Sequence, residues 1–117
     1  MTDSTQDHIE RGLELKNSGQ YDQALEEFQA AMDDDPACDE IYHQIGLVYY
    51  FTGEFEENVV WLEKAVVINP SNLKARIDLA LSYMSIFGDN DKAREQLEEV
   101  LRQDPSHEEA NRHIVFL

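Results

Sequence analysis

Four histidines and one cysteine are the side chains of this chain best suited to metal binding or nucleophilic chemistry. The histidines stand at positions 8, 43, 107 and 113. None is paired with another at the spacing of metal ligands, since His107 and His113 are six residues apart and would lie on different faces of a helix. Cys38 is the only cysteine, so an internal disulfide and a two-cysteine metal or redox site are excluded. We therefore predict that the chain holds no metal.

A short acidic run is the one other candidate for a cation-binding site in the sequence. Gly88, Asp89, Asn90 and Asp91 begin like a calcium loop, but the following glycine and the distal bidentate glutamate are missing. The run fits better as a solvated turn that caps the next helix. The chain also lacks a phosphate-binding loop, a nucleophile elbow and a dinucleotide fingerprint. We therefore predict no cofactor and no enzymatic activity.

The charge balance excludes two classes of partner. The 117 residues include nine Lys plus Arg and 25 Asp plus Glu, a formal net charge of -16. Such a charge repels phosphate backbones and anionic lipid headgroups, so we expect neither nucleic acid nor membrane as a partner. It attracts a basic protein or peptide. It also fits an elongated surface that is kept soluble by charge, or a salt-adapted organism, and the sequence leaves these alternatives open.

The first residues and the hydropathy bear on location. Residues 1–8 are polar and show no basic start followed by an apolar run, so no secretory signal is expected. No apolar stretch approaches the roughly 20 residues that a membrane span needs. Together with the single cysteine, these features favour a reducing compartment and a cytoplasmic location.

A repeat of 34 residues organises the chain, and such a period is typical of stacked helical units. Gly12 recurs as Gly46 and Ala80, and five further positions match at the same spacing: Gly19 and Gly53, Tyr21 and Phe55, Phe28 and Leu62, Ala31 and Ala65, Pro36 and Pro70. After residue 83 the spacing grows to 35, so that Gly88 and Pro105 follow Gly53 and Pro70. One residue has therefore been inserted near 86–90.

Each unit is predicted to form two helices, because apolar residues recur three and four apart on both sides of a glycine-centred break. The first helices are expected at about 5–17, 39–51 and 73–86, the second at about 21–34, 55–68 and 90–103, and a last one from about 107 to 117. The prolines should end the second helices, with Ser71 and Ser106 as N-caps of the next. The recurring small residue at mid-helix predicts a tight helix crossing.

The second unit carries a family signature of aromatic, small, large apolar and proline positions. Its residues are Tyr42, Ile45, Gly46, Tyr49, Gly53, Phe55, Leu62, Ala65 and Pro70. On these residues, the chain resembles the tetratricopeptide repeat family over almost its whole length. The resemblance implies an all-α, right-handed α-solenoid of three helical hairpins with a C-terminal capping helix. It also implies a single domain, 1–117, with repeats at about 5–38, 39–72 and 73–107 and a terminal helix at about 107–117.

One residue departs from the family pattern inside this unit. Asn58 stands where the family strongly prefers alanine, as Ala24 and Ala93 do in the other two units. We expect local strain or a buried polar contact at this position.

The same resemblance implies a non-catalytic scaffold or adaptor that binds a peptide or helix of a client protein in a concave groove lined by the first helices. The implied contact residues are Ile9, Leu13, His43, Gln44, Leu47, Tyr50, Phe51, Ile77, Leu81 and Met84. Their largely apolar character suits a client segment with bulky apolar side chains. The alternative is that Leu13, Leu47 and Leu81 only fill space between hairpins.

The family includes a subset that holds a C-terminal carboxylate of a chaperone in a clamp of lysine, asparagine and arginine. Here Ile9 and Leu13 occupy the first lysine and asparagine places, Gln44 the second amide place, and Asp78 the arginine place; only Lys74 agrees. Because an acid at residue 78 would repel a carboxylate, we expect the chain not to be of this carboxylate-clamp type.

The back of the second unit is unusually apolar. Val60, Trp61 and Val67 replace residues that are mostly charged in the other units. They could form a second contact surface for self-association or a neighbouring protein, or be covered by the last helix or a loop. The apolar end 114–117 leaves three alternatives: it docks on the third hairpin, belongs to a longer array, or contacts a partner. Homo-oligomerisation through the patch or the last helix is thus the competing hypothesis to client binding.

Overall fold

The computed structural model describes residues 3–117, which form seven helices. These are α1 (Asp3–Asn17), α2 (Tyr21–Asp34), α3 (Asp39–Thr52), α4 (Phe55–Ile68), α5 (Leu73–Ser85), α6 (Asn90–Gln103) and α7 (Glu108–Ile114). The three second helices have the predicted bounds, and the first helices differ from them by two residues or fewer. Residues 1 and 2, which begin the predicted domain, lie outside the described part.

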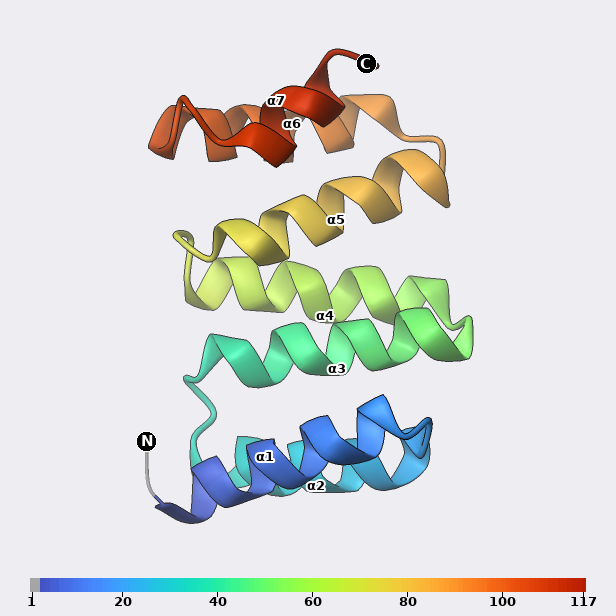
Figure 1. Cartoon of the computed structure of the whole chain (residues 1–117), viewed down its shortest axis with the longest axis vertical. Helices are drawn as coiled ribbons and strands as arrows, with labels where there is room; N and C mark the ends of the chain where they lie inside the picture. Colours follow the sequence, from blue (N-terminus) through green and yellow to red (C-terminus); the bar gives the residue numbers. More distant parts are fainter. Residues whose placement is uncertain (1–2) are drawn as a thin grey trace.

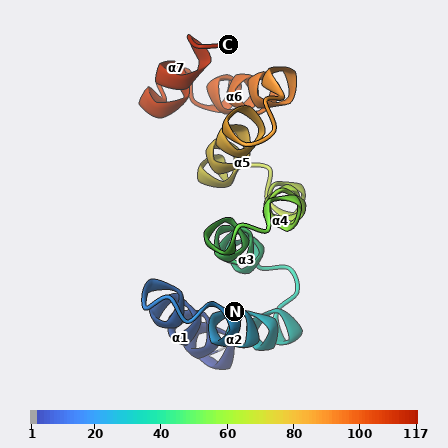
Figure 2. The same ribbon diagram turned by 90° about the vertical axis from the view of Figure 1, so that its right-hand side faces the viewer.

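The helices stack in chain order along an axis of 41 Å, as Figure 1 shows. In the turned view of Figure 2, α1, α3, α5 and α7 lie on one side and α2, α4 and α6 on the other. The chain is therefore the predicted right-handed α-solenoid of three hairpins, with α7 packed on α6. Within residues 3–117, no helix combines the length and apolar character needed to cross a membrane.

The two helices of each hairpin cross at the small residue that the repeat predicted. A Cβ atom added to Gly12 would come within 2.5 Å of Cε1 of Phe28, and one added to Gly46 within 2.9 Å of Cγ of Leu62. Distances below 3.0 Å are closer than carbon atoms pack. The third hairpin has Ala80, which is fully buried. The predicted tight crossing is confirmed at the first two hairpins.

The hairpin turn of the second unit depends on a glycine conformation. Gly53 has a φ of +81°, a left-handed conformation that ends α3. Its amide donates to the carbonyl of Tyr50, and the amide of Glu54 donates to the carbonyl of Tyr49, at 3.2 and 2.9 Å. These two bonds satisfy carbonyls that the end of the helix leaves open, and a residue with a Cβ atom would be strained there.

The predicted caps at Ser71 and Ser106 are wrong. Asn72 and His107 are the N-caps of α5 and α7, and their side chains accept from the amides of residues 75 and 110. The reason is a turn between hairpins, in which the amide of Asn72 donates to the carbonyl of Asn69 at 3.0 Å. This turn takes up the proline and the serine, so each N-cap lies one residue later than we predicted, at Asn72 and at His107.

The buried apolar residues form two clusters. One joins α1, α2 and α3 around Phe28 and Ile41, and the other joins α4 to α7 around Leu62 and Leu97. Tyr42, at the start of α3, packs against both. The core is thus a continuous strip between the two helix layers, and it leaves the outer faces of both layers free for other contacts.

We predict that Gly12→Ala destabilises the protein by about 1–3 kcal/mol, the usual result of inserting a methyl group into a packed core. The gain of about 1 kcal/mol in helix propensity should not offset the contact with Phe28. Urea unfolding followed by circular dichroism measures the difference. Phe28→Leu added to Gly12→Ala should recover part of the loss, since the third hairpin combines Ala80 with Leu97 at the equivalent positions. A Gly12→Ala protein that is more stable than the native one would contradict the tight crossing.

Candidate protein-binding groove

The concave side of the stack contains a pocket between α3 and α5. In Figure 2, the ribbons of α1 and α7 extend farther out than those of α3 and α5 on this side. The pocket has a volume of about 350 Å³. It is lined by Leu47, Tyr50, Phe51, Asn58, Leu62, Asp78, Leu81, Ser82, Ser85 and Ile86. Four of the predicted contact residues therefore lie together around one cavity: Leu47, Tyr50, Phe51 and Leu81.

Exposed aromatic rings form the rim of this pocket. Tyr50 is 48% and Phe51 55% exposed. The ring of Phe51 stacks on Tyr21, with centroids 6.0 Å apart, and meets the ring of Tyr50 edge-on at 5.6 Å. Such ring pairs hold each other in place, so the rim presents a fixed apolar surface.

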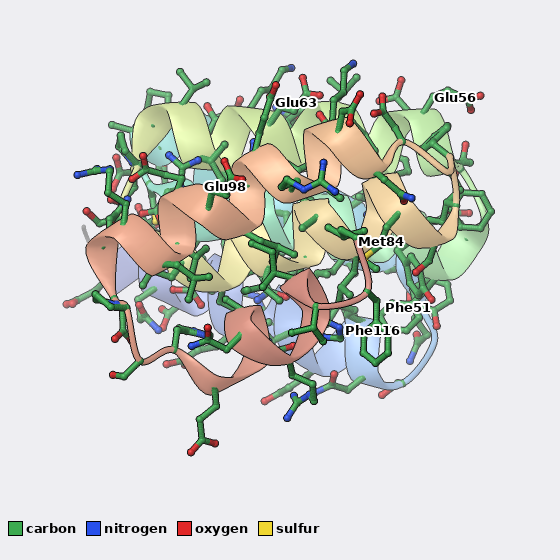
Figure 3. All side chains as sticks on the ribbon, turned by 90° about the horizontal axis from the view of Figure 1, so that it is seen from above. Phe51, Glu56, Glu63, Met84, Glu98 and Phe116 are labelled. Atoms are coloured by element: carbon green, nitrogen blue, oxygen red, sulfur yellow. The ribbon has the colours of Figure 1, made fainter. Side chains whose placement is uncertain are left out.

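The apolar rim continues along the stack. Seen down the long axis in Figure 3, Phe51, Met84 and Phe116 lie on the same side of the molecule, whereas Glu56 and Glu63 lie on the opposite side. Met84 is half-buried and Phe116 is 75% exposed. The concave side therefore carries an apolar strip, contributed by α3, α5 and the segment after α7.

Three predicted contact residues present almost no surface. Ile9 and Ile77 are 1% exposed and belong to the two core clusters, and His43 is 6% exposed. Leu13 is half-buried and packs against the first cluster. These side chains lie beneath the groove and support its floor, while Leu47, Leu81 and the aromatic rim face the open space.

Polar contacts connect neighbouring first helices across the floor. Nζ of Lys16 on α1 donates to Oε1 of Gln44 on α3 at 2.6 Å. Nε2 of His43 on α3 lies 2.7 Å from Oδ2 of Asp78 on α5. Burial lowers the pKa of Lys16, and the nearby charge of Asp78 opposes this shift. The predicted contact residues His43 and Gln44 are therefore engaged in holding α1, α3 and α5 together.

Asn58 joins three helices at the base of the pocket. Its Nδ2 donates to the carbonyl of Gly46 on α3 at 2.8 Å, and its Oδ1 accepts from Oγ of Ser82 on α5 at 2.7 Å. Asn58 is 1% exposed. The expected buried polar contact is confirmed, and both hydrogen bonds compensate the cost of burying the amide.

Sequence reasoning did not select Ser82 and Ile86, although both line the pocket. A signal for Ser82 was present, because it stands 34 residues after Val48 and is polar where that unit is apolar. Ile86 lies at the inserted residue, just beyond the end of α5. No repeat equivalent exists there, so the period alone could not place its side chain.

The apolar patch on the opposite layer is open. Val60 is 42% and Val67 77% exposed, and together with Trp61 they line a shallow depression of about 620 Å³. Trp61 stacks on Tyr42 at 5.8 Å, and Nζ of Lys64 lies 4.1 Å from the centre of the indole ring. Because α7 packs on α6, the alternative that the last helix covers this patch is wrong.

The apolar C-terminal end is divided between core and surface. Ile114 and Leu117 pack against the second core cluster, which confirms docking on the third hairpin for these two residues. Val115 and Phe116 are 74% and 75% exposed.

Among residues 3–117, no group of three or more His, Cys, Asp or Glu side chains is placed to hold a metal ion. The loop at 88–91 caps α6 through Asp89, as predicted.

Two family models match the chain. Residues 12–53 match a model described as TPR repeat, and residues 39–72 match one described as Tetratricopeptide repeat. Among curated proteins, the chain is 28% identical over 102 residues to mouse DnaJ homolog subfamily C member 3. This match covers 87% of the chain and 20% of the mouse protein. The chain thus spans about a fifth of the relative that it matches.

Several solved structures have the same fold. The first TPR of Spaghetti (RPAP3) bound to HSP90 peptide SRMEEVD has a TM-score of 0.87 at 22% identity, covering 99% of this chain and 91% of that one. MamA has a TM-score of 0.83 at 24% identity, covering 94% and 64%. The P58(IPK) TPR domain has a TM-score of 0.84 at 25% identity, covering 96% and 32%.

We predict that Asn58→Ala and Ser82→Ala each cost about 1–3 kcal/mol, because each leaves a buried polar group without its partner. The double variant should cost less than the sum of the two, by about 0.5–3 kcal/mol, since the residues share one hydrogen bond. Urea unfolding of the four proteins measures this coupling. Ser85→Ala, on the exposed side of the same helix, is the matched control; additive losses would contradict the proposed contact.

Proposed function

Because the chain belongs to the tetratricopeptide repeat family, we propose that it is a non-catalytic scaffold that holds a peptide or helix of a client protein in its concave groove. Proteins of this family are generally interaction scaffolds, and a domain of the same fold is bound to a peptide. The observation that carries the proposal is the open apolar pocket between α3 and α5, with its exposed aromatic rim. Exposed apolar surface of this kind usually marks a contact site.

We propose fewer direct contact residues than the ten that the sequence predicted for the groove. The residues that would contact the client are exposed or half-buried: Leu47, Tyr50, Phe51 and Leu81 line the pocket, and Met84 lies on the same side of the molecule as Phe51 (Figure 3). The half-buried Leu13 and Gln44 would extend this set toward α1. The buried Ile9, His43 and Ile77 would act indirectly by positioning the contact residues. A rigid apolar groove of this kind suits the apolar face of a client helix or an extended segment.

We further propose that the client is not held by its C-terminal carboxylate. Asp78 would repel such a group, and its carboxylate is already engaged with His43. Ile9 and Leu13 offer no charge at the other clamp places. The net charge of -16 favours a client with basic residues. Residues 1–117 would act as one domain, and the unpaired Cys38 fits a cytoplasmic location.

Leu47→Glu combined with Leu81→Glu should abolish client binding, because two carboxylates would then lie in the apolar centre of the groove. Client peptides would first be selected from a random peptide library with the native protein, and their affinity measured by fluorescence anisotropy. We expect a loss of at least about tenfold, the effect of about 1.4 kcal/mol.

Val60→Glu combined with Val67→Glu is the matched control, since it adds the same two charges at exposed positions on the opposite layer. It should leave the affinity of the selected peptides unchanged. Circular dichroism must show that all variants are folded. If the groove variant is folded and binds the peptides as the native protein does, the groove assignment is wrong.

A second candidate function is assembly through the apolar patch of α4. The observation that favours it is the exposure of Val67 and Val60 beside Trp61 on a layer that is otherwise acidic. A tryptophan at the centre of an apolar patch is a common anchor of protein interfaces. We propose self-association as the use of this patch, with Lys64 able to pair with acidic residues of the second copy.

If the patch mediates assembly, the mass in solution should rise with protein concentration, and Val67→Glu and Trp61→Ala should each keep the protein monomeric. Size-exclusion chromatography with light scattering measures this mass. Leu47→Glu with Leu81→Glu should not change it. A native protein that stays monomeric at millimolar concentration would exclude assembly and leave the groove as the working surface.

A further inference from the structure

We propose that the pocket between α3 and α5 receives the side chain of a lysine or arginine of the client, with Asp78 as its counterion. This inference rests on the proposed function and specifies the chemistry of its central contact. Asp78 is the only charged residue among those that line the pocket. Its side chain is 19% exposed, so the carboxylate is partly shielded from water in a pocket whose lining is mostly apolar.

The carboxylate of Asp78 is held in place and can accept further hydrogen bonds. His43 approaches Oδ2 at 2.7 Å from the floor of the groove, and its own side chain is 8% exposed. This contact fixes the direction of the carboxylate. An ionised carboxylate has about four acceptor positions, so those that His43 does not use remain for a donor in the pocket. Charge-assisted hydrogen bonds of this type are about twice as strong as neutral ones.

The walls suit the rest of a long cationic side chain. Leu47, Leu81 and Ile86 offer an apolar surface for the methylene groups of lysine or arginine. The rings of Tyr50 and Phe51, at the rim, can lie against the cationic head or the guanidinium plane. The hydroxyl of Ser82 donates to Asn58, which leaves its oxygen lone pairs as further acceptors.

The charges around the pocket determine whether it prefers a cationic or an anionic ligand. Burial lowers the pKa of Lys16, and the nearby charge of Asp78 opposes this shift, so Lys16 is a cation near Asp78 that would compete with a ligand. Its ammonium group is bonded to Gln44, and it does not line the pocket. With a net charge of -16 on the chain, the surrounding field attracts cations and repels a carboxylate ligand.

The test compares three blocked heptapeptides, Ala-Leu-Ala-X-Ala-Leu-Ala, in which X is arginine, citrulline or glutamate. Citrulline has the shape of arginine without its charge. Each peptide is titrated into the ¹⁵N-labelled full chain, and amide shifts of residues 47, 81, 82 and 85 report occupation of the pocket. We expect the arginine peptide to bind at least about tenfold more tightly than the citrulline peptide, and the glutamate peptide to bind least.

Asp78→Asn should lower the affinity of the arginine peptide to that of the citrulline peptide, since the amide can still accept from His43 and the fold is kept. Glu98→Gln, on the opposite side of the molecule (Figure 3), is the control with the same change in net charge and should have no effect. Lys16→Met, which removes the competing cation, should tighten binding of the arginine peptide.

Three results would overturn the inference: equal binding of the arginine and citrulline peptides, equal weakening by Asp78→Asn and Glu98→Gln, or no shift at the pocket amides with any peptide. The first of these would leave the proposed function intact, because the groove would still bind peptides. If the library-selected peptides also bound after Leu47→Glu with Leu81→Glu, the proposed function would fail independently of Asp78.

Discussion

The close crossing of the two helices in each hairpin is the constraint on which the rest of the structure depends. At Gly12 and Gly46 there is no room for a methyl group, because Phe28 and Leu62 occupy the space that a Cβ atom would need. Ridges of side chains on one helix can then enter the grooves of the next, and the buried strip becomes a dense core. Since each first helix uses one face for this crossing, its opposite face is left for the concave side. The groove is therefore a consequence of how the hairpins close.

Hydrogen bonds act together with the apolar core contacts that join neighbouring hairpins. His43 with Asp78, Lys16 with Gln44, and Ser82 with Asn58 each join helices of neighbouring hairpins. In a stack where each unit contacts only its neighbours, such interfaces supply a large part of the stability and set the curvature. A buried hydrogen bond is satisfied in one arrangement only. The pair of His43 and Asp78 joins α3 directly to α5, so it contributes to the spacing of these two helices and to the width of the pocket.

The period of 34 residues predicted the helices, the crossings and the glycine turns, because these features depend on residues close together in the chain. Other features depend on contacts between hairpins, which the period does not describe. Ile9 and Ile77 occupy groove positions in the repeat, yet they are buried, because they belong to the two core clusters that join several helices. Ser71 and Ser106 were predicted as caps, but the turn after each second helix places the cap one residue later, at Asn72 and His107. The pocket itself depends on Ile86, whose position follows an insertion with no repeat equivalent.

The outer side of one helix layer carries acidic side chains, and the opposite side of the molecule carries apolar ones. The layer of α4 and α6 carries Glu63 and Glu98 on its outer side, whereas the opposite side carries Phe51 and Met84 (Figure 3). Charges on the outer layer act at a distance and raise the rate of encounter with a basic partner. The apolar strip acts only on contact and slows dissociation. Because the patch around Trp61 and the pocket beside Asp78 lie on different layers, a partner on one does not block the other. Under the proposed function, the same short stack would hold a client in the groove and leave the patch free for a second protein.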